Sequence, residues 1–227
     1  MTVAFIPARM DSSRFPGKPL ADIDGKPMIQ RVYDSVCRND NLRFVRVATH
    51  NAEIMKLGLP VIGTFGIYNN GTERVAHAAR LTHLPDDEIV INVQGDLPII
   101  LPSILDDLMV QFEDPTVIVA TVASNIKERD GANHNVVKVD VGKDGYANWF
   151  ARDRISEHEH VGIYAFRNYF LQLISELQPT RDEEETDLEQ MRIIDHGFSI
   201  KVVFTEHECP SVNVPADIEK VVKCIHA

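Results

Sequence analysis

Short apolar runs alternate with helical segments along the first half of this 227-residue chain. The runs are short enough to be buried strands, which we expect at residues 3–6, 44–48, 60–63 and 89–93. Helical periodicity follows three of these runs, in segments that include residues 29–36, 75–79 and 104–112. This alternation predicts an α/β fold with a largely parallel sheet and helices on both of its faces.

The second half of the chain differs, because loops rather than helices separate most of its strand-like segments. These segments lie at residues 117–123, 136–141, 147–150 and 161–166, with a hairpin-like Asp144-Gly145 turn. We therefore expect mixed or antiparallel pairing there. A helix near 184–196 ended by Gly197, a strand at 200–204 and a helix spanning 218–225 follow. The prediction is a single domain, residues 1–227, in which residues 117–180 form a mixed β/α portion.

Charge and cysteine content exclude several classes of function. The 23 basic and 34 acidic residues give a net charge of −11, which argues against a general nucleic-acid-binding protein. Three widely spaced cysteines without a C-x-x-C motif fit a reducing compartment, and neither a disulfide framework nor a thiolate zinc site. No apolar run approaches membrane-spanning length, so we expect a cytoplasmic protein that does not bind membranes.

A basic loop follows the first predicted strand, which is expected to end near Ile6 because Pro7 comes next. The loop carries Arg9, Arg14 and Lys18, with serines and Gly17 between them. Three cations on one loop suit a polyanion, and a nucleoside triphosphate is the obvious candidate. The alternative is a merely solvated strand end, but three cations in ten positions of so acidic a chain favour an anion site.

Asp96 comes directly after the apolar run at 89–93 and its Gln94-Gly95 extension. Ligands of open α/β sheets bind at the carboxyl ends of the strands. A carboxylate there suits Mg²⁺, which takes one or two protein carboxylates together with substrate phosphates. The alternative is that Asp96 caps the next helix, and Pro98 and Pro102 make such a cap ambiguous.

Several blocks of the sequence resemble the 3-deoxy-manno-octulosonate cytidylyltransferases, also called CMP-KDO synthetases. The most specific are the front signature at 6–9 and 12–20 and the Val-Gln-Gly-Asp block at 93–96. Further blocks lie at 71–74, 135–139, 160–164, 188–192 and 214–219. Because the blocks occur in the family's order, the resemblance covers essentially the whole chain.

The resemblance implies a GT-A-like, three-layer α/β/α nucleotidyltransferase with a mixed, mostly parallel sheet. It implies a homodimer in which residues 117–180 contribute to the sugar site and the dimer contact. The implied reaction needs Mg²⁺ and transfers CMP from CTP to the anomeric hydroxyl of an acidic eight-carbon sugar, with release of pyrophosphate. The product would serve the synthesis of lipopolysaccharide and other cell-surface sugars.

The resemblance also implies roles for individual residues. Arg9, Arg14, Lys18 and Asp96 would be catalytic, and Asp96 would bind the metal. Other contacts to the nucleotide would come from Pro7, Ala8, Ser13, Thr72, Arg74 and Gln94. The sugar acid would be bound by Arg152, His160, Tyr164, Glu189 and Gln190.

Three departures from the family bear on these roles. Asn213 stands where the family has a second metal-binding Asp, and His50 stands where an acidic residue is usual. The segment between Arg152 and His160 is also shorter than expected, at the place where the sugar should bind. The 8-amino analogue of the sugar or another ulosonate therefore stays open as the acceptor, as does a non-catalytic CTP- or sugar-binding relative.

Overall fold

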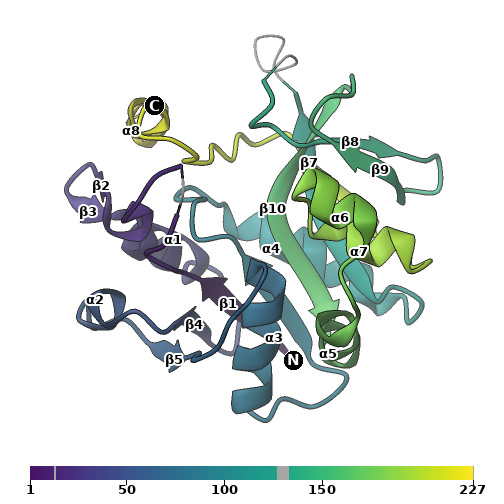
Figure 1. The fold of residues 1–227 in the computed structure, drawn as a ribbon, viewed down its shortest axis with the longest axis horizontal. Helices are drawn as coiled ribbons and strands as arrows, with labels where there is room; N and C mark the ends of the chain where they lie inside the picture. Colours follow the sequence, from purple (N-terminus) through teal and green to yellow (C-terminus); the bar gives the residue numbers. More distant parts are fainter. Residues whose placement is uncertain (13, 127–132, 227) are drawn as a thin grey trace.

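The chain folds around one mixed sheet (Figure 1). The structure is a computed structural model, and it describes residues 1–12, 14–126 and 133–226. Nine of its strands form the sheet: β1 (Thr2–Pro7), β4 (Val45–Thr49), β5 (Val61–Gly63), β6 (Ile89–Val93), β7 (Val119–Asn125), β8 (Lys138–Val141), β9 (Ala147–Ala151), β10 (His158–Arg167) and β11 (Lys201–Thr205). Strands β2 (Asp22–Ile23) and β3 (Lys26–Pro27) form a separate hairpin.

The sheet has the strand order β11-β7-β10-β6-β1-β4-β5. β6, β1, β4 and β5 are parallel, as the alternating first half predicts. β10 is antiparallel to both β6 and β7, and it also pairs with β8, which carries β9. The predicted fold class, a mixed and mostly parallel sheet between helices, is confirmed.

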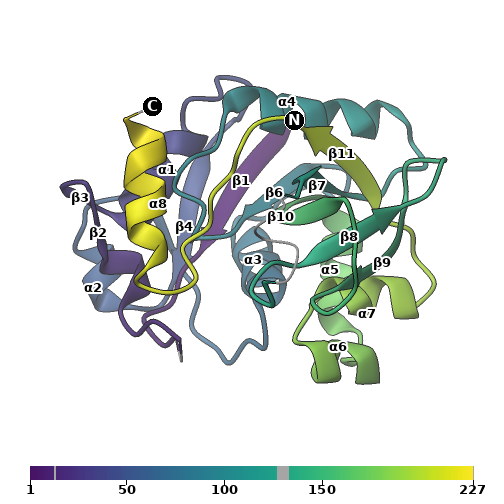
Figure 2. The ribbon, with the colours of Figure 1, turned by 90° about the horizontal axis from the view of Figure 1, so that it is seen from above.

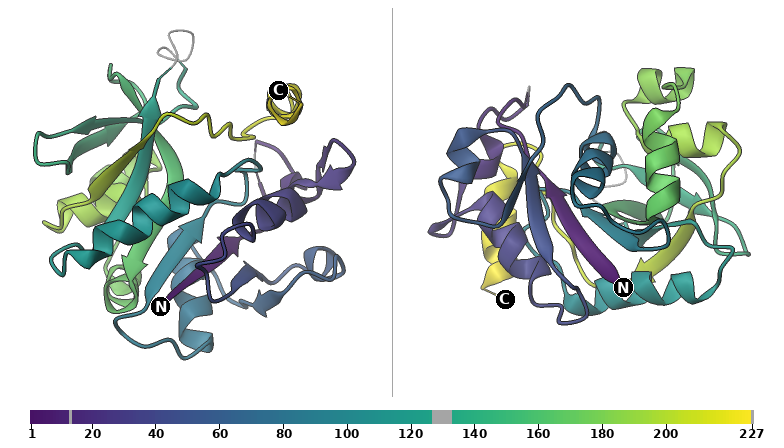
Figure 3. Two further views of the ribbon diagram at one scale, coloured as in Figure 1. Left: turned by 180° about the vertical axis from the view of Figure 1, so that it is seen from behind. Right: turned by 90° about the horizontal axis from the view of Figure 1, so that it is seen from below.

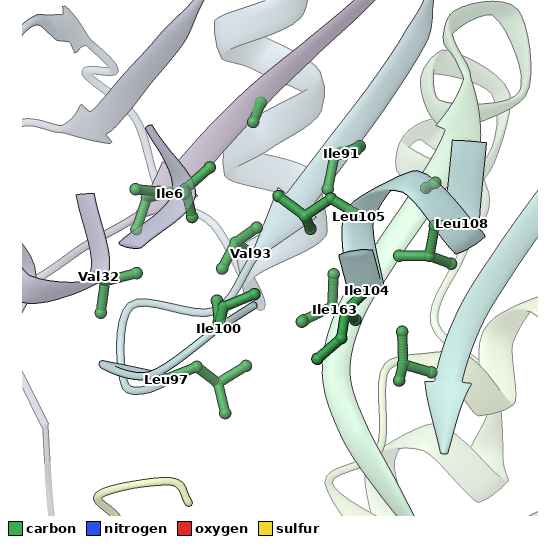
Figure 4. Close-up of a cluster of buried hydrophobic side chains, with 14 of the residues drawn as sticks. Ile6, Val32, Ile91, Val93, Leu97, Ile100, Ile104, Leu105, Leu108 and Ile163 are labelled. Atoms are coloured by element: carbon green, nitrogen blue, oxygen red, sulfur yellow. The ribbon is translucent and has the colours of Figure 1, made fainter. Parts of the chain in front are cut away.

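Helices cover both faces of the sheet (Figure 2). They are α1 (Met28–Val36), α2 (Ala52–Met55), α3 (Gly71–Leu81), α4 (Pro102–Val110), α5 (Asn168–Glu176), α6 (Arg181–Thr186), α7 (Gln190–Asp195) and α8 (Asp217–Ile225), with short 3-10 turns at Lys18–Leu20 and Gln111–Glu113. One core packs α1 and α4 against one face, where β1 and β6 contribute Ile6, Ile91 and Val93 (Figure 4). A second core packs α3, α5 and α7 against the other face.

The C-terminal helix returns to the start of the chain. Figure 3 shows α8 beside α1 and the β2–β3 hairpin. A third apolar cluster joins them, in which Val212 and Val221 pack with Ile23 and Met28. The segment before α8 therefore passes close to the loop that follows β1. None of the helices in the described ranges combines the length and the apolar character that crossing a bilayer requires.

β1 ends at Pro7, next to the predicted end near Ile6, and Pro7 pairs with Ala48 there. Two predictions about helices were wrong. The single helix expected near 184–196 is two helices, because Asp187 adopts a left-handed conformation with φ 54°. That turn directs Leu188 into the second core. Helices α2 and α5 were not predicted at all, although Phe170, Leu171 and Ile174 give α5 one buried face.

Candidate active site

Two neighbouring cavities lie at the edge of the sheet where β1 and β6 end. The smaller has a volume of about 290 Å³ and the larger about 580 Å³. One set of residues lines both cavities and is called the shared wall here: Arg9, Arg14, Asn70, Gly71, Gln94, Asp96 and Asp187. Because Arg9 follows β1 and Asp96 follows β6, the shared wall stands at the carboxyl ends of parallel strands.

The basic loop after β1 brings its cations to the smaller cavity. Arg9, Arg14 and Lys18 all line this cavity, together with Pro7 and Ala8. Gly17 has φ 74°, a left-handed conformation that favours glycine, and it directly precedes Lys18. Ser13, the remaining predicted contact of this loop, lies outside the described residues. The cavity is thus positively charged on the side of the loop.

Asp96 is hydrogen-bonded to one residue near the beginning of the chain, Lys18, and to one near its end, Val212. Its Oδ2 accepts a hydrogen bond of 2.6 Å from Lys18 Nζ, and its side chain stays 24% exposed. Lys18 Nζ also donates to the carbonyl of Val212 at 3.1 Å, and the backbone N–H of Val212 donates to the Asp96 carbonyl at 2.9 Å. These bonds bring the next residue, Asn213, to the larger cavity, which Asp96 also lines.

The side-chain amide of Asn213 lines the larger cavity and is anchored through its nitrogen. Its Nδ2 donates to Ser211 Oγ at 2.9 Å, while its backbone N–H donates to Asp217 Oδ2 at 2.7 Å. Among the residues that the structure describes, no three His, Cys, Asp or Glu side chains form a metal-binding group. A cation at this edge would therefore take the Asp96 carboxylate, the Asn213 amide oxygen and oxygens of a bound substrate.

Arg74 is buried and lines the smaller cavity. Its Nη1 donates to the hydroxyl of Thr64 at 2.9 Å and to His50 Nδ1 at 3.2 Å. The guanidinium also lies over the Tyr68 ring, with 4.5 Å between its carbon and the ring centroid. Because an arginine can only donate, His50 accepts through a neutral imidazole nitrogen. At this position, where the resemblance leads one to expect an acidic residue, His50 therefore accepts a hydrogen bond from Arg74.

Gln94 and Thr72 meet at the carboxylate of Glu189. Gln94 Nε2 donates to Glu189 Oε1 at 3.3 Å, and the Thr72 backbone N–H donates to Oε2 at 3.2 Å. A Cβ on Gly71 would lie 2.9 Å from Gln94 Nε2, and a Cβ on Gly162 would lie 2.9 Å from Gln94 Cγ. Glycines on both sides are therefore required for this position of Gln94.

We expect the Glu189→Gln substitution to remove part of the pH dependence of stability. Burial raises the pKa of Glu189 to about 7, although the bond from Thr72 opposes this shift. The folded protein therefore binds this proton more tightly than the unfolded chain. Its stabilising effect is complete below the unfolded pKa of about 4.3 and is lost as the pH rises through about 7.

The measurement is urea denaturation of the parent and the Glu189→Gln variant at about pH 5.5 and about pH 8.5. On rising pH, the parent should lose on the order of 1 kcal/mol more than the variant in free energy of unfolding. An equal loss in both proteins would contradict the raised pKa of Glu189.

The predicted sugar contacts line the larger cavity: Arg152, His160, Tyr164, Glu189 and Gln190. The Thr121 hydroxyl donates to the Ile163 carbonyl at 2.8 Å, so His160 Nε2 is the donor in its 2.9 Å bond to Thr121. Burial, helped by nearby Arg152, lowers the pKa of His160 to about 3. His160 is therefore neutral, and its Nδ1 is an acceptor.

Gln190 leaves one buried group unsatisfied. Its Oε1 accepts from the Tyr164 hydroxyl at 3.0 Å, whereas its Nε2 has no hydrogen-bond partner in the described part of the chain. A buried donor without a partner costs free energy.

The sequence-based site gave no role to three residues of the shared wall: Asn70, Gly71 and Asp187. Asn70 precedes the Gly-Thr-Glu-Arg block, and its Oδ1 accepts from the Glu73 N–H at 2.9 Å as the N-cap of α3. An Asn three residues before a Glu is a recognisable helix start, and this signal could have found it. Asp187 gave no such signal, because its place depends on the break between α6 and α7.

Solved structures resemble this one over nearly their whole length. A structure titled as CMP:2-keto-3-deoxy-manno-octonic acid synthetase complexed with CTP has a TM-score of 0.89 and 35% identity, and the match covers 99% of this chain and 98% of that one. A 4-diphosphocytidyl-2C-methyl-D-erythritol synthase from Anaerococcus prevotii, at 13% identity and a TM-score of 0.64, shares the fold. The fold and the site define a nucleotidyltransferase.

Sequence comparison identifies the family within the nucleotidyltransferases to which the chain belongs. The profile of the cytidylyltransferase family matches residues 3–208. The 3-deoxy-manno-octulosonate cytidylyltransferase of Nitratidesulfovibrio vulgaris is 38% identical over 97% of this chain and 94% of its own length. The mitochondrial enzyme of the same name from Arabidopsis thaliana is also 38% identical, over 96% of this chain and 81% of its own length. The chain belongs to the 3-deoxy-manno-octulosonate cytidylyltransferase family.

Proposed function

We propose that the protein transfers CMP from CTP to the anomeric hydroxyl of 3-deoxy-manno-octulosonate and releases pyrophosphate. The observation that carries this proposal is the shared wall. A cavity lined by three cations lies next to a larger polar cavity, and Asp96, Arg9 and Arg14 line both. A reaction that joins two substrates needs its reacting atoms at such a boundary.

In this proposal the triphosphate lies against Arg9, Arg14 and Lys18. Lys18 and Arg14 would neutralise the charge that builds on the departing pyrophosphate, and Arg74 and Gln94 would lie by the cytidine. The sugar oxygen forms a bond to the α-phosphorus as the bond to the pyrophosphate oxygen breaks, and the hydroxyl proton passes to water. No covalent bond to the protein is needed. Catalysis then consists of positioning and electrostatic stabilisation.

The acid sugar would occupy the larger cavity. Arg152 supplies the charge that a sugar carboxylate needs. His160, whose Nδ1 is an acceptor, suits the hydroxyl groups of a sugar, and Gln190 lines the same cavity. Glu189 and Tyr164 complete this wall of the cavity.

Asp96 of the shared wall and Asn213 of the larger cavity together fit Mg²⁺. Asp96 offers a partly exposed carboxylate, and Asn213 offers an amide oxygen in the same cavity. Mg²⁺ accepts such a small set of protein ligands when substrate phosphates complete its coordination. When bound, the ion would lower the pKa of the attacking hydroxyl and neutralise phosphate charge.

We expect the Asn213→Asp variant to reach half-maximal rate at a lower Mg²⁺ concentration than the parent. A carboxylate adds a negative charge at the place where an uncharged amide now faces the cavity, and Mg²⁺ prefers charged oxygen ligands. The measurement is the rate as a function of Mg²⁺ at saturating substrates. An unchanged Mg²⁺ requirement would mean that Asn213 does not contact the ion.

The proposal includes a homodimer in which residues 117–180 form part of the contact. Exposed apolar side chains in this portion support it, since Ile155 is 95% exposed and Tyr169 is 44% exposed. Light scattering at several protein concentrations would measure the oligomeric state. A monomer at all concentrations would contradict this part of the proposal.

Pyrophosphate release tests the reaction. The protein is incubated with Mg²⁺ and either CTP or UTP, and with 3-deoxy-manno-octulosonate or its 8-amino analogue. We expect release with CTP that depends on the sugar, together with a CMP-sugar of matching mass. CTP binding without release in the presence of either sugar would contradict the proposed transfer.

A further inference from the structure

A buried arginine joins three helices beside the two cavities. Arg192 of α7 is only 3% exposed. Its Nε and Nη2 donate to the two carboxylate oxygens of Glu183 in α6, at 2.7 and 2.8 Å. Nη2 also donates to Glu73 Oε1 in α3 at 3.0 Å. These three residues are called the Arg192 triad below.

The carboxylates of the triad hold the loop before α3. Glu73 Oε2 accepts from the Asn69 backbone N–H at 2.8 Å, and its Oε1 accepts from Asn69 Nδ2 at 3.0 Å. Glu183 Oε1 accepts from Asn70 Nδ2 at 3.2 Å. Both asparagines line the larger cavity, and Asn70 lines the smaller one as well.

Arg192 itself belongs to α7, the helix that begins with two of the proposed sugar contacts. Glu189, the N-cap of α7, and Gln190, its first residue, lie three and two residues before Arg192. Glu189 in turn accepts the Thr72 N–H at 3.2 Å, immediately after the loop that the asparagines occupy. The Arg192 triad thus connects the loop at residues 69–71 to the helix that carries the sugar contacts.

Stability alone is a weak reason for such a cluster. Charges that are removed from water lose solvation, and well-packed apolar side chains often stabilise a core as well or better. A planar guanidinium that binds one carboxylate with two nitrogens, and a second carboxylate as well, instead fixes relative positions. The arrangement favours a role in placing the loop and α7.

We propose that Arg192 is a positioning residue that couples the two cavities, so that occupation of one raises the affinity of the other. This inference rests on the proposed function. A nucleotide in the smaller cavity contacts Asn70 and Gly71, which also line the larger cavity, and Glu183 and Arg192 transmit the position of Asn70 to α7. A sugar in the larger cavity then meets a wall that the nucleotide has already placed, and the coupling is equal in both directions.

The test measures sugar binding by calorimetry in the absence and presence of saturating non-hydrolysable CTP analogue with Mg²⁺. In the parent we expect the analogue to tighten sugar binding about tenfold, within the usual range of coupling between sites. In Arg192→Lys, which keeps the charge but not the planar fork, the factor should fall to about one. Each ligand alone should bind the variant within about threefold of the parent.

A second variant and a control complete the test. Glu73→Gln weakens the link to α3 without removing the arginine, so it should lower the coupling even if Arg192→Lys does not fold. Glu176→Gln breaks the exposed ion pair between Arg80 of α3 and Glu176 of α5, in which Nη2 and Oε1 are 3.3 Å apart. This pair lies away from the two cavities. It should keep the coupling of the parent.

Three results have distinct meanings. Reduced thermal stability with unchanged coupling in both variants would overturn the inference and leave the triad a structural role. A parent that binds both ligands without coupling would also overturn it. A parent that binds neither CTP analogue nor sugar would instead contradict the proposed function.

Discussion

The Asp96→Ala variant is expected to lose CMP transfer while it keeps its fold. Asp96 supplies the one carboxylate that the proposal gives to Mg²⁺, and it fixes Lys18 Nζ at 2.6 Å. Removing both functions should cost several kcal/mol of transition-state stabilisation, which corresponds to a fall in kcat of at least about 10³-fold. The measurement is kcat at saturating CTP and sugar, together with the melting temperature.

A surface pair provides the matched control for this prediction. Lys26 Nζ and Asp34 Oδ2 form the same type of ion pair at 2.9 Å, far more exposed than the pair at the shared wall. Asp34→Ala should keep full activity, since exposed ion pairs contribute little. A fully active Asp96→Ala protein would remove Asp96 from the mechanism.

Lys18→Met should lower kcat by about 10²–10³-fold, by analogy with the loss of one donor that stabilises developing charge. Lys18 is 17% exposed, and its Nζ extends from the basic loop to Asp96, where the leaving pyrophosphate would be. Methionine retains the length of the side chain but neither its charge nor its donors. The KM for CTP should rise much less than kcat falls, because the charge on pyrophosphate grows mainly in the transition state.

Steady-state kinetics over a matrix of CTP and sugar concentrations separate these two parameters. Lys26→Met, which removes the lysine of the exposed pair, is the control and should behave as the parent. If Lys18→Met raised the KM for CTP without lowering kcat, Lys18 would only bind the nucleotide. Its assignment to the leaving group would then be wrong.

Local signals in the sequence were sufficient to predict the positions of those site residues that directly follow strands. The apolar run at Ile89–Val93 predicts a central strand, and Asp96 is then placed at its carboxyl end by the polarity of the sheet. The cations after β1 reach the same edge because β1 and β6 are parallel neighbours. For these residues, spacing along the chain determines position in space.

Other parts of the site depend on contacts that no local pattern encodes. Arg192 and Glu73 are 119 positions apart, and each alone is an ordinary helical charge. The left-handed Asp187 that separates α6 from α7 interrupts what reads as one helix. The pairing of Val212 with Asp96, which brings Asn213 to the cavity, likewise follows from the return of the chain to its beginning.

A crystal structure with a non-hydrolysable CTP analogue, Mg²⁺ and 3-deoxy-manno-octulosonate tests the central claim most directly. We expect the triphosphate in the smaller cavity against Arg9, Arg14 and Lys18, and the sugar in the larger cavity. Its anomeric oxygen should lie about 3–3.5 Å from the α-phosphorus, beside Asp96. A nucleotide bound outside the smaller cavity, or a sugar whose anomeric oxygen points away from the shared wall, would contradict the account.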